Sequence, residues 1–256
     1  MTTGRLDGRG ILITRPARQA AGLAQEIAAI GGAPFIFPAI VILPPPDRRA
    51  LDRAQSELDR YDYAVFVSAN AVEYGVGAPL AWPRRLVAFA PGPGTLAALS
   101  AVGIDNARMP SKRMDSEGLL ELPELTEVAG KRVLVFRGGG GRELLADTLA
   151  ARGATVDVVD CYARAAPSAG AGGLSEALAA GRIDASTFTS SEGADNLWAL
   201  LDAAARERIA GIAAFAPHER IAQRLRALGF RFVVVTEPSD AGLIAALLRR
   251  FAAGGY

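Results

Sequence analysis

The feature that most constrains the fold of this chain is an internal duplication. The stretch GRGILITRPARQAAGLAQEIAAIGGAPF at residues 8–35 is similar to the stretch KRVLVFRGGGGRELLADTLAARGATV at residues 131–156. In this alignment Arg15 lies opposite Arg137. Each stretch reads as a buried strand followed by an amphipathic helix, so the chain begins the same structural unit twice.

The similarity continues downstream of both stretches. With the same shift, DYAVFVSANAV from Asp62 aligns with DASTFTSSEGA from Asp184. VAFAPGPGTLAALSAVGI from Val87 then aligns with AAFAPHERIAQRLRALGF from Ala213, with a slightly larger shift. The duplication therefore covers most of the chain, and the fold has to accommodate two similar halves.

Each half alternates short apolar runs with amphipathic segments, which is the pattern of strand, crossover helix and parallel strand. The apolar runs are nearly continuous, as expected for strands that are covered on both faces. We therefore predict an α/β fold with two similar doubly wound parallel-sheet domains. The predicted strands are residues 10–14, 63–67, 86–90, 132–136, 185–189, 211–215 and 231–236.

Two extended segments, residues 33–46 and 156–167, interrupt the alternation at matching places in the repeats. Both end in proline, which disfavours a helix before it, and we interpret them as paired connectors between domains. If the chain crosses at both connectors, each domain takes parts of both repeats; the alternative is one domain per repeat, divided near residue 125. The crossing predicts a discontinuous domain of residues 1–35 and 168–256, an inserted domain of residues 47–160, and connectors at residues 36–46 and 161–167.

Composition excludes several classes of function. The 28 basic residues nearly balance the 27 acidic ones, so there is no overall field to attract nucleic acid, and any anionic ligand has to be held by local groups. One cysteine, Cys161, and one histidine, His218, argue against a disulfide framework and against a metal site. The N-terminus lacks an apolar signal core and no later run approaches the ~20 apolar residues of a membrane span, which predicts a cytoplasmic protein.

Ligands of open parallel sheets bind beyond the carboxyl ends of the strands, where helix N-termini present unpaired amide groups. In this chain the loops at those positions are rich in Gly, Ser, Asn, Thr and Pro. Three such loops per domain would face one another across a cleft. They are TRPAR (14–18), SANAV (68–72), PGPGT (91–95), RGGGGR (137–142), SSEGA (190–194) and PHER (217–220).

The four-glycine loop resembles a phosphate loop but fits neither common type. Glu143 stands where a dinucleotide fingerprint has its third glycine, and no lysine followed by serine or threonine closes the loop as in a Walker A motif. Glycine also serves any tight strand-to-helix junction through close backbone approach. We therefore expect no nucleotide cofactor here.

Other candidate residues have a structural role as the alternative to ligand binding. Ser68 and Ser190 follow strands and precede helices, so N-capping is their default role. Arg15 and Arg137 stand at equivalent strand ends, where they could meet carboxylates or be solvated at the surface. Tyr162 could pack the connector, or direct its hydroxyl into a cleft.

These segments, in this order, resemble the uroporphyrinogen-III synthase family over nearly the whole chain. The family's fold implies two α/β domains joined by a two-stranded connector, with the first domain built from both chain ends. The motifs that carry the resemblance are ITRP (13–16), FVSANAV (66–72), PS followed by DSEGLLELPEL (110–125), GKRVLVFRGGGGRELLADTLAARGATVDVVDCYAR (130–164) and FTSSEGADNL (188–197).

The resemblance implies an activity as well as a fold. The family converts linear hydroxymethylbilane to uroporphyrinogen III, with loss of water and inversion of the terminal ring, and without a metal or organic cofactor. A tyrosine that matches Tyr162 would give a proton to the departing hydroxyl. The segment PHERIA departs from the family's pattern, because Ile221 stands where the family has a threonine. The resemblance therefore does not imply that the His218 loop contacts the substrate.

The resemblance also implies which residues hold the substrate. Helix N-termini, glycine backbone and arginines would bind the carboxylates of the bilane. The expected substrate-binding residues are Arg15, Ser68, Asn70, Thr95, Arg137, Gly138, Gly139, Gly140, Ser190 and Ser191.

Two other functions fit a duplicated cleft. One is a two-domain binding protein for an anionic metabolite, although such proteins are commonly exported and this chain shows no signal. The other is a nucleotide-sugar transferase with two Rossmann-like domains, which usually needs a longer chain. For the synthase, we expect a monomer that uses hydroxymethylbilane, with hydroxymethylbilane synthase as its candidate partner and no contact with nucleic acid or membrane.

Overall fold

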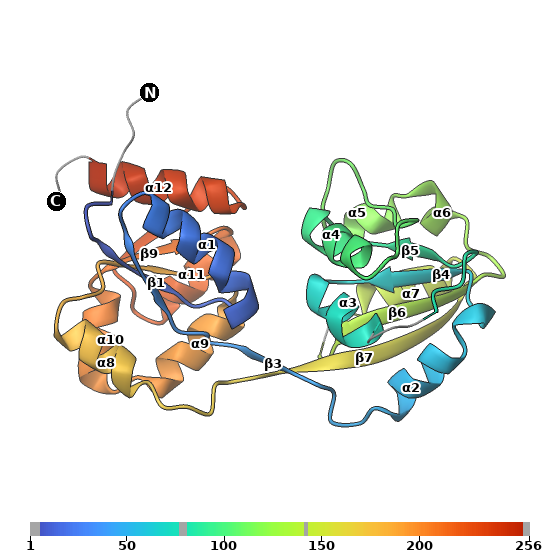
Figure 1. Cartoon of the computed structure of the whole chain (residues 1–256), viewed down its shortest axis with the longest axis horizontal. Helices are drawn as coiled ribbons and strands as arrows, with labels where there is room; N and C mark the ends of the chain where they lie inside the picture. Colours follow the sequence, from blue (N-terminus) through green and yellow to red (C-terminus); the bar gives the residue numbers. More distant parts are fainter. Residues whose placement is uncertain (1–5, 77–80, 141–142, 253–256) are drawn as a thin grey trace. The chain divides into compact units, whose positions relative to one another are not determined.

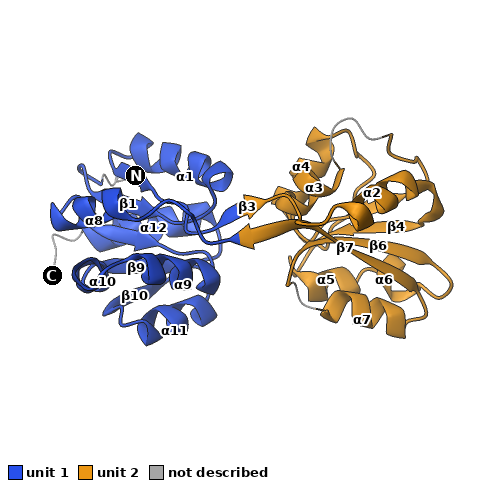
Figure 2. Cartoon of the chain, turned by 90° about the horizontal axis from the view of Figure 1, so that it is seen from below, with its two compact units in different colours: residues 1–41, 165–256 blue, residues 42–164 orange. Residues whose placement is uncertain are grey.

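The computed structural model describes residues 6–76, 81–140 and 143–252 (Figure 1). The chain divides into two compact units, which are coloured separately in Figure 2. Unit 1 comprises residues 1–41 and 165–256, and unit 2 comprises residues 42–164. Unit 1 therefore combines the start of the first repeat with the end of the second. Unit 2 combines the end of the first repeat with the start of the second.

Unit 1 contains a five-stranded sheet in the order β10-β9-β8-β1-β2, and every neighbouring pair is parallel. Its strands are β1 (Gly10–Ile13), β2 (Ala33–Ile36), β8 (Ala185–Thr187), β9 (Ala213–Ala216) and β10 (Phe232–Val235). Its helices are α1 (Ala17–Ala29), α8 (Gly172–Ala179), α9 (Ser191–Leu200), α10 (Ala203–Ala210), α11 (Glu219–Ala227) and α12 (Asp240–Ala252).

Helices cover both faces of this sheet (Figure 1). Side chains alternate between the faces along a strand, and β1 shows this with three fully buried residues. Ile11 and Ile13 pack with residues of α1 and α12, whereas Leu12 packs with residues of α8, α9, α10 and α11. The continuous apolar run of β1 is thus explained by burial on both sides.

Unit 2 contains the second sheet, in the order β3-β7-β6-β4-β5, with β7-β6, β6-β4 and β4-β5 parallel. Its strands are β3 (Val41–Leu43), β4 (Tyr63–Phe66), β5 (Val87–Phe89), β6 (Arg132–Gly138) and β7 (Thr155–Ala165). Its helices are α2 (Arg49–Ser56), the 3₁₀ turn η1 (Leu58–Arg60), α3 (Ala69–Val76), α4 (Pro93–Ala101), α5 (Ser116–Leu120), α6 (Pro123–Thr126) and α7 (Leu144–Ala151).

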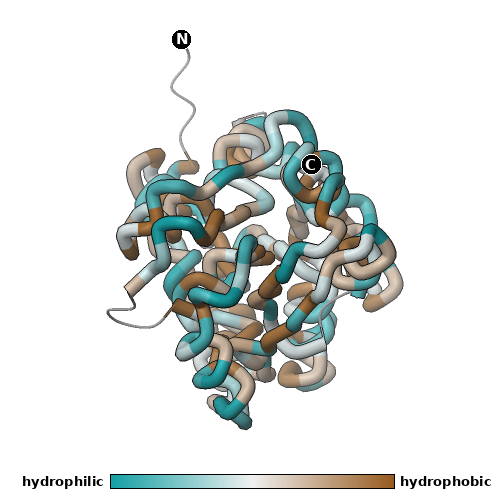
Figure 3. Tube along the Cα trace, turned by 90° about the vertical axis from the view of Figure 1, so that its right-hand side faces the viewer, coloured by the Kyte–Doolittle hydropathy of each residue, from teal (hydrophilic) through white to brown (hydrophobic). Residues whose placement is uncertain are grey.

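The second sheet is covered in the same way as the first. Along β6, Val133 and Val135 pack with α5, α6 and α7, whereas Leu134 and Phe136 pack with α2, α3 and α4. Hydrophilic and hydrophobic residues alternate along the helices in Figure 3, as expected when each helix presents one apolar face to a sheet.

The two sheets share one strand register. In unit 1, Ile11 lies opposite Ala185 where β1 pairs with β8. In unit 2, Val133 lies opposite Tyr63 where β6 pairs with β4. The shift that relates Arg15 to Arg137 also relates Ile11 to Val133 and Tyr63 to Ala185. The duplication therefore preserves the strand pairing at the centre of each sheet.

An aspartate anchors this central pairing in both units. The Asp184 carboxylate accepts a hydrogen bond from the backbone N–H of Gly10 at 2.8 Å, and Arg9 pairs with it at 2.7 Å. At the equivalent place, the Asp62 carboxylate accepts from the N–H of Arg132 at 2.9 Å. Lys131 pairs with Asp62 at 3.3 Å, as Arg9 does with Asp184.

All the strands predicted from apolar runs are present, but several are shorter or displaced. The run predicted at residues 185–189 ends at Thr187, and the one predicted at 211–215 is observed at Ala213–Ala216. The two segments predicted as connectors contain β2, β3 and the long strand β7, and β3 is a hydrogen-bonded neighbour of β7. The predicted boundaries after residues 35 and 160 fall inside strands, because β2 and β7 pair with β1 and β6.

The Asp62 contacts predict a pH-dependent contribution to stability. The N–H of Arg132, against the opposing effect of burial and with help from Lys131, lowers the pKa of Asp62 below its usual value. A carboxylate with a lowered pKa stabilises the folded state above its unfolded pKa of about 4, and this effect is lost as the pH falls through the folded pKa.

We therefore expect Asp62→Asn to lower the free energy of unfolding at pH 7, with a difference that shrinks at pH 3. Asparagine keeps an oxygen acceptor, so the variant removes mainly the charge. Urea unfolding at both pH values measures the effect, with Asp59→Asn at an exposed position as the control. A loss of equal size at both pH values would contradict the electrostatic explanation.

Candidate functional site

The residues predicted to bind substrate or to act in catalysis divide between the two units, and most of them lie at or just beyond the carboxyl ends of parallel strands. Arg15, Ser190 and Ser191 belong to unit 1. The remaining predicted residues, all in unit 2, are Ser68, Asn70, Thr95, Arg137, Gly138, Gly139, Gly140 and Tyr162.

Unit 1 has a pocket of about 150 Å³, partly open to solvent, at the carboxyl ends of its strands. Residues after four strands line it, including Arg15 after β1, Thr189 after β8 and His218 after β9. The fourth contribution is Ser239 and Asp240, which follow β10. The pocket thus lies where ligands of open parallel sheets bind.

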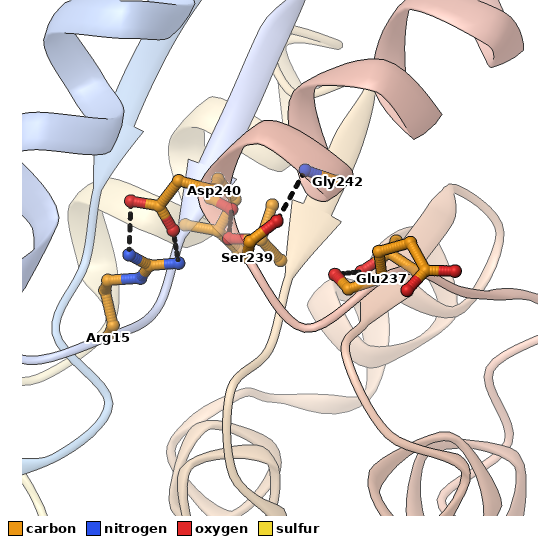
Figure 4. A network of polar contacts seen from close by, with 8 residues as sticks. Arg15, Glu237, Ser239, Asp240 and Gly242 are labelled. Atoms are coloured by element: carbon orange, nitrogen blue, oxygen red, sulfur yellow. Dashed lines mark hydrogen bonds and ion pairs between the residues drawn. The ribbon is translucent and has the colours of Figure 1, made fainter. Parts of the chain in front are cut away.

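The guanidinium of Arg15 is already engaged in this pocket. It donates two hydrogen bonds to the Asp240 carboxylate, at 3.1 and 2.8 Å, in a bidentate ion pair (Figure 4). The Arg15 side chain is only 13% exposed. A ligand carboxylate would have to displace Asp240 in order to bind this guanidinium with the same geometry.

Sequence reasoning did not include the loop after β10 among the candidate loops. Ser239 accepts a hydrogen bond from the N–H of Gly242 at 3.0 Å and so caps the first turn of α12 (Figure 4). The sequence TEPSD at residues 236–240 has the same polar, helix-starting character as the other loops. The segment PSKRMDSEGLL at residues 110–120 of the first repeat leads into the capped helix α5 in the same way, so the duplication itself carries the signal for this loop.

The two equivalent serines cap helices, as their positions predicted. Ser190 is the N-cap of α9 and accepts from the N–H of Gly193 at 3.0 Å, and Ser191 is the first residue of that helix. Ser68 accepts from the N–H of Ala71 at 3.1 Å at the start of α3. A side-chain cap satisfies one amide of the first turn and leaves others available to an anion.

Asn70 and Thr95 occupy the first turns of α3 and α4. The Thr95 residue is 6% exposed, so contact of its side chain with a ligand requires a local rearrangement.

Tyr162 lies within the long strand β7 rather than at a free strand exit, and it is 1% exposed. Its hydroxyl lies 3.1 Å from the Ser68 hydroxyl, and the guanidinium of Arg164 donates to it at 3.3 Å. Arg164 also lies over the phenol ring, 5.7 Å from its centroid, and the Tyr74 ring packs 6.2 Å away. The phenol therefore has polar partners but is covered.

A shift in register between β6 and β7 brings Tyr162 to this position. Arg137 pairs with Asp160, but Gly138 pairs with Tyr162, so Cys161 is skipped. Such a bulge re-aims a side chain in an otherwise regular sheet. The buried Cys161 thiol donates to the carbonyl oxygen of Arg137 at 3.2 Å, and burial raises the pKa of this thiol to about 12.

The glycines of the RGGGGR loop differ in their surroundings. Gly138 is the last residue of β6 and does not lie at a helix N-terminus, since α7 begins at Leu144. Gly139 donates its N–H to the Tyr162 carbonyl at 3.0 Å, and Gly140 has a left-handed backbone with φ of +74°. Gly141 and Arg142 lie outside the described residues.

Arg137 is held by two carboxylates of the chain. It donates to Asp160 of β7 and to Glu143, both at 2.9 Å, and its side chain is 15% exposed. It is thus neither freely solvated nor open to a ligand carboxylate without displacement of a partner.

Within the described residues, no helix is long and apolar enough to cross a membrane. The same part of the chain holds no group of three or more His, Cys, Asp or Glu side chains placed to bind a metal ion.

Comparison with known proteins shows which family the chain belongs to. A family model described as uroporphyrinogen-III synthase HemD matches residues 21–245. The uroporphyrinogen-III synthase of Escherichia coli K12 is 34% identical over 237 residues, which are 90% of this chain and 96% of that protein. The chain belongs to the uroporphyrinogen-III synthase family. The Salmonella typhimurium member is 35% identical over 238 residues, with 90% of this chain and 96% of that protein covered.

Solved structures of the uroporphyrinogen-III synthase family share the fold. A mutant uroporphyrinogen III synthase from Thermus thermophilus gives a TM-score of 0.57 at 19% identity, over 94% of this chain and 98% of that one. The Helicobacter pylori uroporphyrinogen-III synthetase gives 0.56 at 17% identity, over 94% and 100%. At these identities the likeness concerns the two-domain α/β fold.

The different surroundings of Gly139 and Gly140 generate a prediction on stability. Gly140→Ala places a Cβ on a left-handed backbone, which should cost about 1–2 kcal/mol of unfolding free energy. At Gly139, where φ is not positive and an added Cβ meets open space, alanine should be neutral or stabilising by up to about 1 kcal/mol. Denaturant unfolding of both variants makes the comparison. Equal stabilities would show that the backbone at Gly140 relaxes without cost.

Proposed function

We propose that this chain closes linear hydroxymethylbilane to uroporphyrinogen III in tetrapyrrole biosynthesis, with loss of water and inversion of the terminal ring. The observation that carries the proposal is identity of about one third to named uroporphyrinogen-III synthases over nine tenths of the chain. In the cell we expect a cytoplasmic monomer that receives its substrate from hydroxymethylbilane synthase.

The geometry of each unit supports binding of a substrate that carries many carboxylates. Loops after parallel strands lead into helices whose first turns are capped by Ser68, Ser190 and Ser239. The remaining amides of such turns, together with the helix dipole, favour an anion. This is also why a nearly neutral protein can hold an anionic substrate.

The two arginines would contribute less to substrate binding than the helix N-termini. Arg15 and Arg137 are neutralised by Asp240 and by Asp160 with Glu143. A substrate carboxylate that binds either arginine has to exchange with a carboxylate of the chain, so the net gain is smaller than for a new ion pair. Amides and glycine backbone therefore supply more of the binding than these two arginines.

For catalysis we assign Tyr162 as the proton donor to the departing hydroxyl. Transfer of the phenol proton to that hydroxyl lets water leave with the electrons of the C–O bond, and a cationic azafulvene remains. Attack by the terminal ring at its substituted carbon gives a spiro intermediate, whose rearrangement inverts the ring. The proton released when the ring regains aromaticity returns to the phenolate, so the enzyme ends unchanged.

The burial of Tyr162 adds a condition to this role. With 1% exposure, the phenol cannot meet a substrate until a neighbouring side chain moves. Arg164 is exposed and lies over the ring, so a shift of its side chain disturbs the core less than movement of a buried neighbour would.

The function predicts a specific product. Purified protein, given freshly prepared hydroxymethylbilane, should yield mainly isomer III, whereas the bilane alone closes to isomer I. Chromatographic separation of the oxidised porphyrins measures the ratio, with heat-denatured protein as the control. Isomer I at the spontaneous rate would contradict the proposal, and tight binding of the bilane in that case would favour the alternative of a binding protein.

Removal of the phenol hydroxyl should slow the reaction. Tyr162→Phe keeps the ring and its packing, and turnover should fall by roughly 10²-fold, the scale of general acid catalysis. Because the hydroxyl also leaves spontaneously, some turnover should persist, and the product should remain isomer III. Tyr63→Phe, a ring-retaining change in β4, is the matched control.

The measurements for Tyr162→Phe are kcat, isomer ratio and thermal midpoint. Wild-type turnover in the folded variant would show that Tyr162 only packs the strand. Normal turnover with a shift toward isomer I would instead assign it to positioning of the terminal ring.

A further inference from the structure

The ring of Tyr162 lies against Gly138, and its hydroxyl lies within hydrogen-bond distance of Ser68 and Arg164. We propose that Gly138 and Arg164 are positioning residues for this phenol: Gly138 makes room for the ring, and Arg164 stabilises the oxygen once its proton has been given to the substrate. The proposal rests on the proposed function, in which Tyr162 is the proton donor.

Gly138 is the residue that the ring of Tyr162 requires. A Cβ built on Gly138 would lie 2.5 Å from two ring carbons of Tyr162 and 2.9 Å from its hydroxyl oxygen. Contacts this short do not occur at real Cβ atoms, so any other residue would push the ring away. The bulge that skips Cys161 sets the two residues opposite each other, and the missing side chain lets the ring lie against β6.

The hydrogen bonds around the phenol oxygen can leave its own proton available, since either hydroxyl of the Ser68–Tyr162 pair can be the donor. Ser68 Oγ accepts the N–H of Ala71, so its hydroxyl hydrogen can be donated to Tyr162 Oη, 3.1 Å away. Arg164 Nη2 donates to the same oxygen at 3.3 Å. A phenol oxygen can accept two hydrogen bonds while it donates one. With Ser68 and Arg164 as the two donors, the phenol proton is free for the substrate hydroxyl.

The charge of Arg164 then matters after proton transfer. Loss of the proton leaves a phenolate, and hydrogen bonds to a charged oxygen are about twice as strong as those between neutral groups. An interaction that strengthens as the C–O bond breaks lowers the barrier, whereas one of constant strength affects only binding. The guanidinium is exposed and lies over the ring, so small movements can uncover the phenol without separating the two groups.

Arg164→Gln and Arg164→Lys test this role together. The glutamine variant removes the charge and should lower kcat about tenfold or more, with KM little changed and isomer III retained. The lysine variant keeps the charge and should recover most of the loss. Rescue by lysine and an effect confined to kcat are results that a purely structural role would not give.

A double-mutant cycle with Tyr162→Phe separates the proposal from its premise. If Arg164 acts through the phenol, Arg164→Gln should have no further effect on kcat in the Tyr162→Phe background. An equal fall in both backgrounds, a rise in KM alone, or failure of lysine to improve on glutamine would overturn the proposal. Wild-type turnover of Tyr162→Phe would overturn the role of the tyrosine, while formation of isomer III by the wild type would leave the proposed function standing.

Gly138→Ala tests the space for the ring. We expect kcat to fall at least tenfold, because the added Cβ displaces the phenol, in assays run well below the thermal midpoint of the variant. Gly173→Ala in α8, where an added Cβ meets open space, is the matched control. Equal kcat values for Gly138→Ala and the control would overturn the part assigned to Gly138, and the Arg164 cycle tests the other part independently.

Discussion

The parallel pairing of strands from different repeats is the constraint on which the rest of the structure depends. At the centre of one sheet β1 of the first repeat pairs with β8 of the second, and at the centre of the other β4 pairs with β6. Each unit therefore needs both repeats to complete its core. Asp184 and Asp62 hold the first residues of these pairs through backbone N–H groups.

The shared register has a consequence for the site. Since equivalent strands end at equivalent heights, the serine-capped loops after β4 and β8 occupy the same place in their respective sheets. Ser68 and Ser190 are then equivalent helix caps, and each unit presents the same kind of serine-capped helix start, which we propose binds carboxylates. Duplication of one α/β pattern thus supplies two equivalent serine-capped edges.

The proposed catalytic residue, Tyr162, lies at a place where the repeats differ. The long strand β7 has the register shift that skips Cys161, and no such shift occurs between β1 and β2. Gly138 has no counterpart of its kind in the first repeat, where Pro16 aligns with it. The glycine run that looked like a phosphate loop thus has at least three separate roles: room for a ring at Gly138, a backbone hydrogen bond at Gly139 and a left-handed turn at Gly140.

The sequence by itself determined the α/β class, the approximate positions of seven strands and the capping roles of Ser68 and Ser190, because hydrophobic period and N-cap chemistry are local properties that neighbouring residues express directly. It left open which half of each repeat joins which core, and it could not show that Arg15 and Arg137 are engaged by Asp240, Asp160 and Glu143. Those features depend on contacts between residues far apart in the chain. The position of Tyr162 against Gly138 depends in addition on a register shift between β6 and β7. Only the tertiary structure decided them, because burial, register and ion pairing are set by how strands meet and not by the residues that flank each side chain.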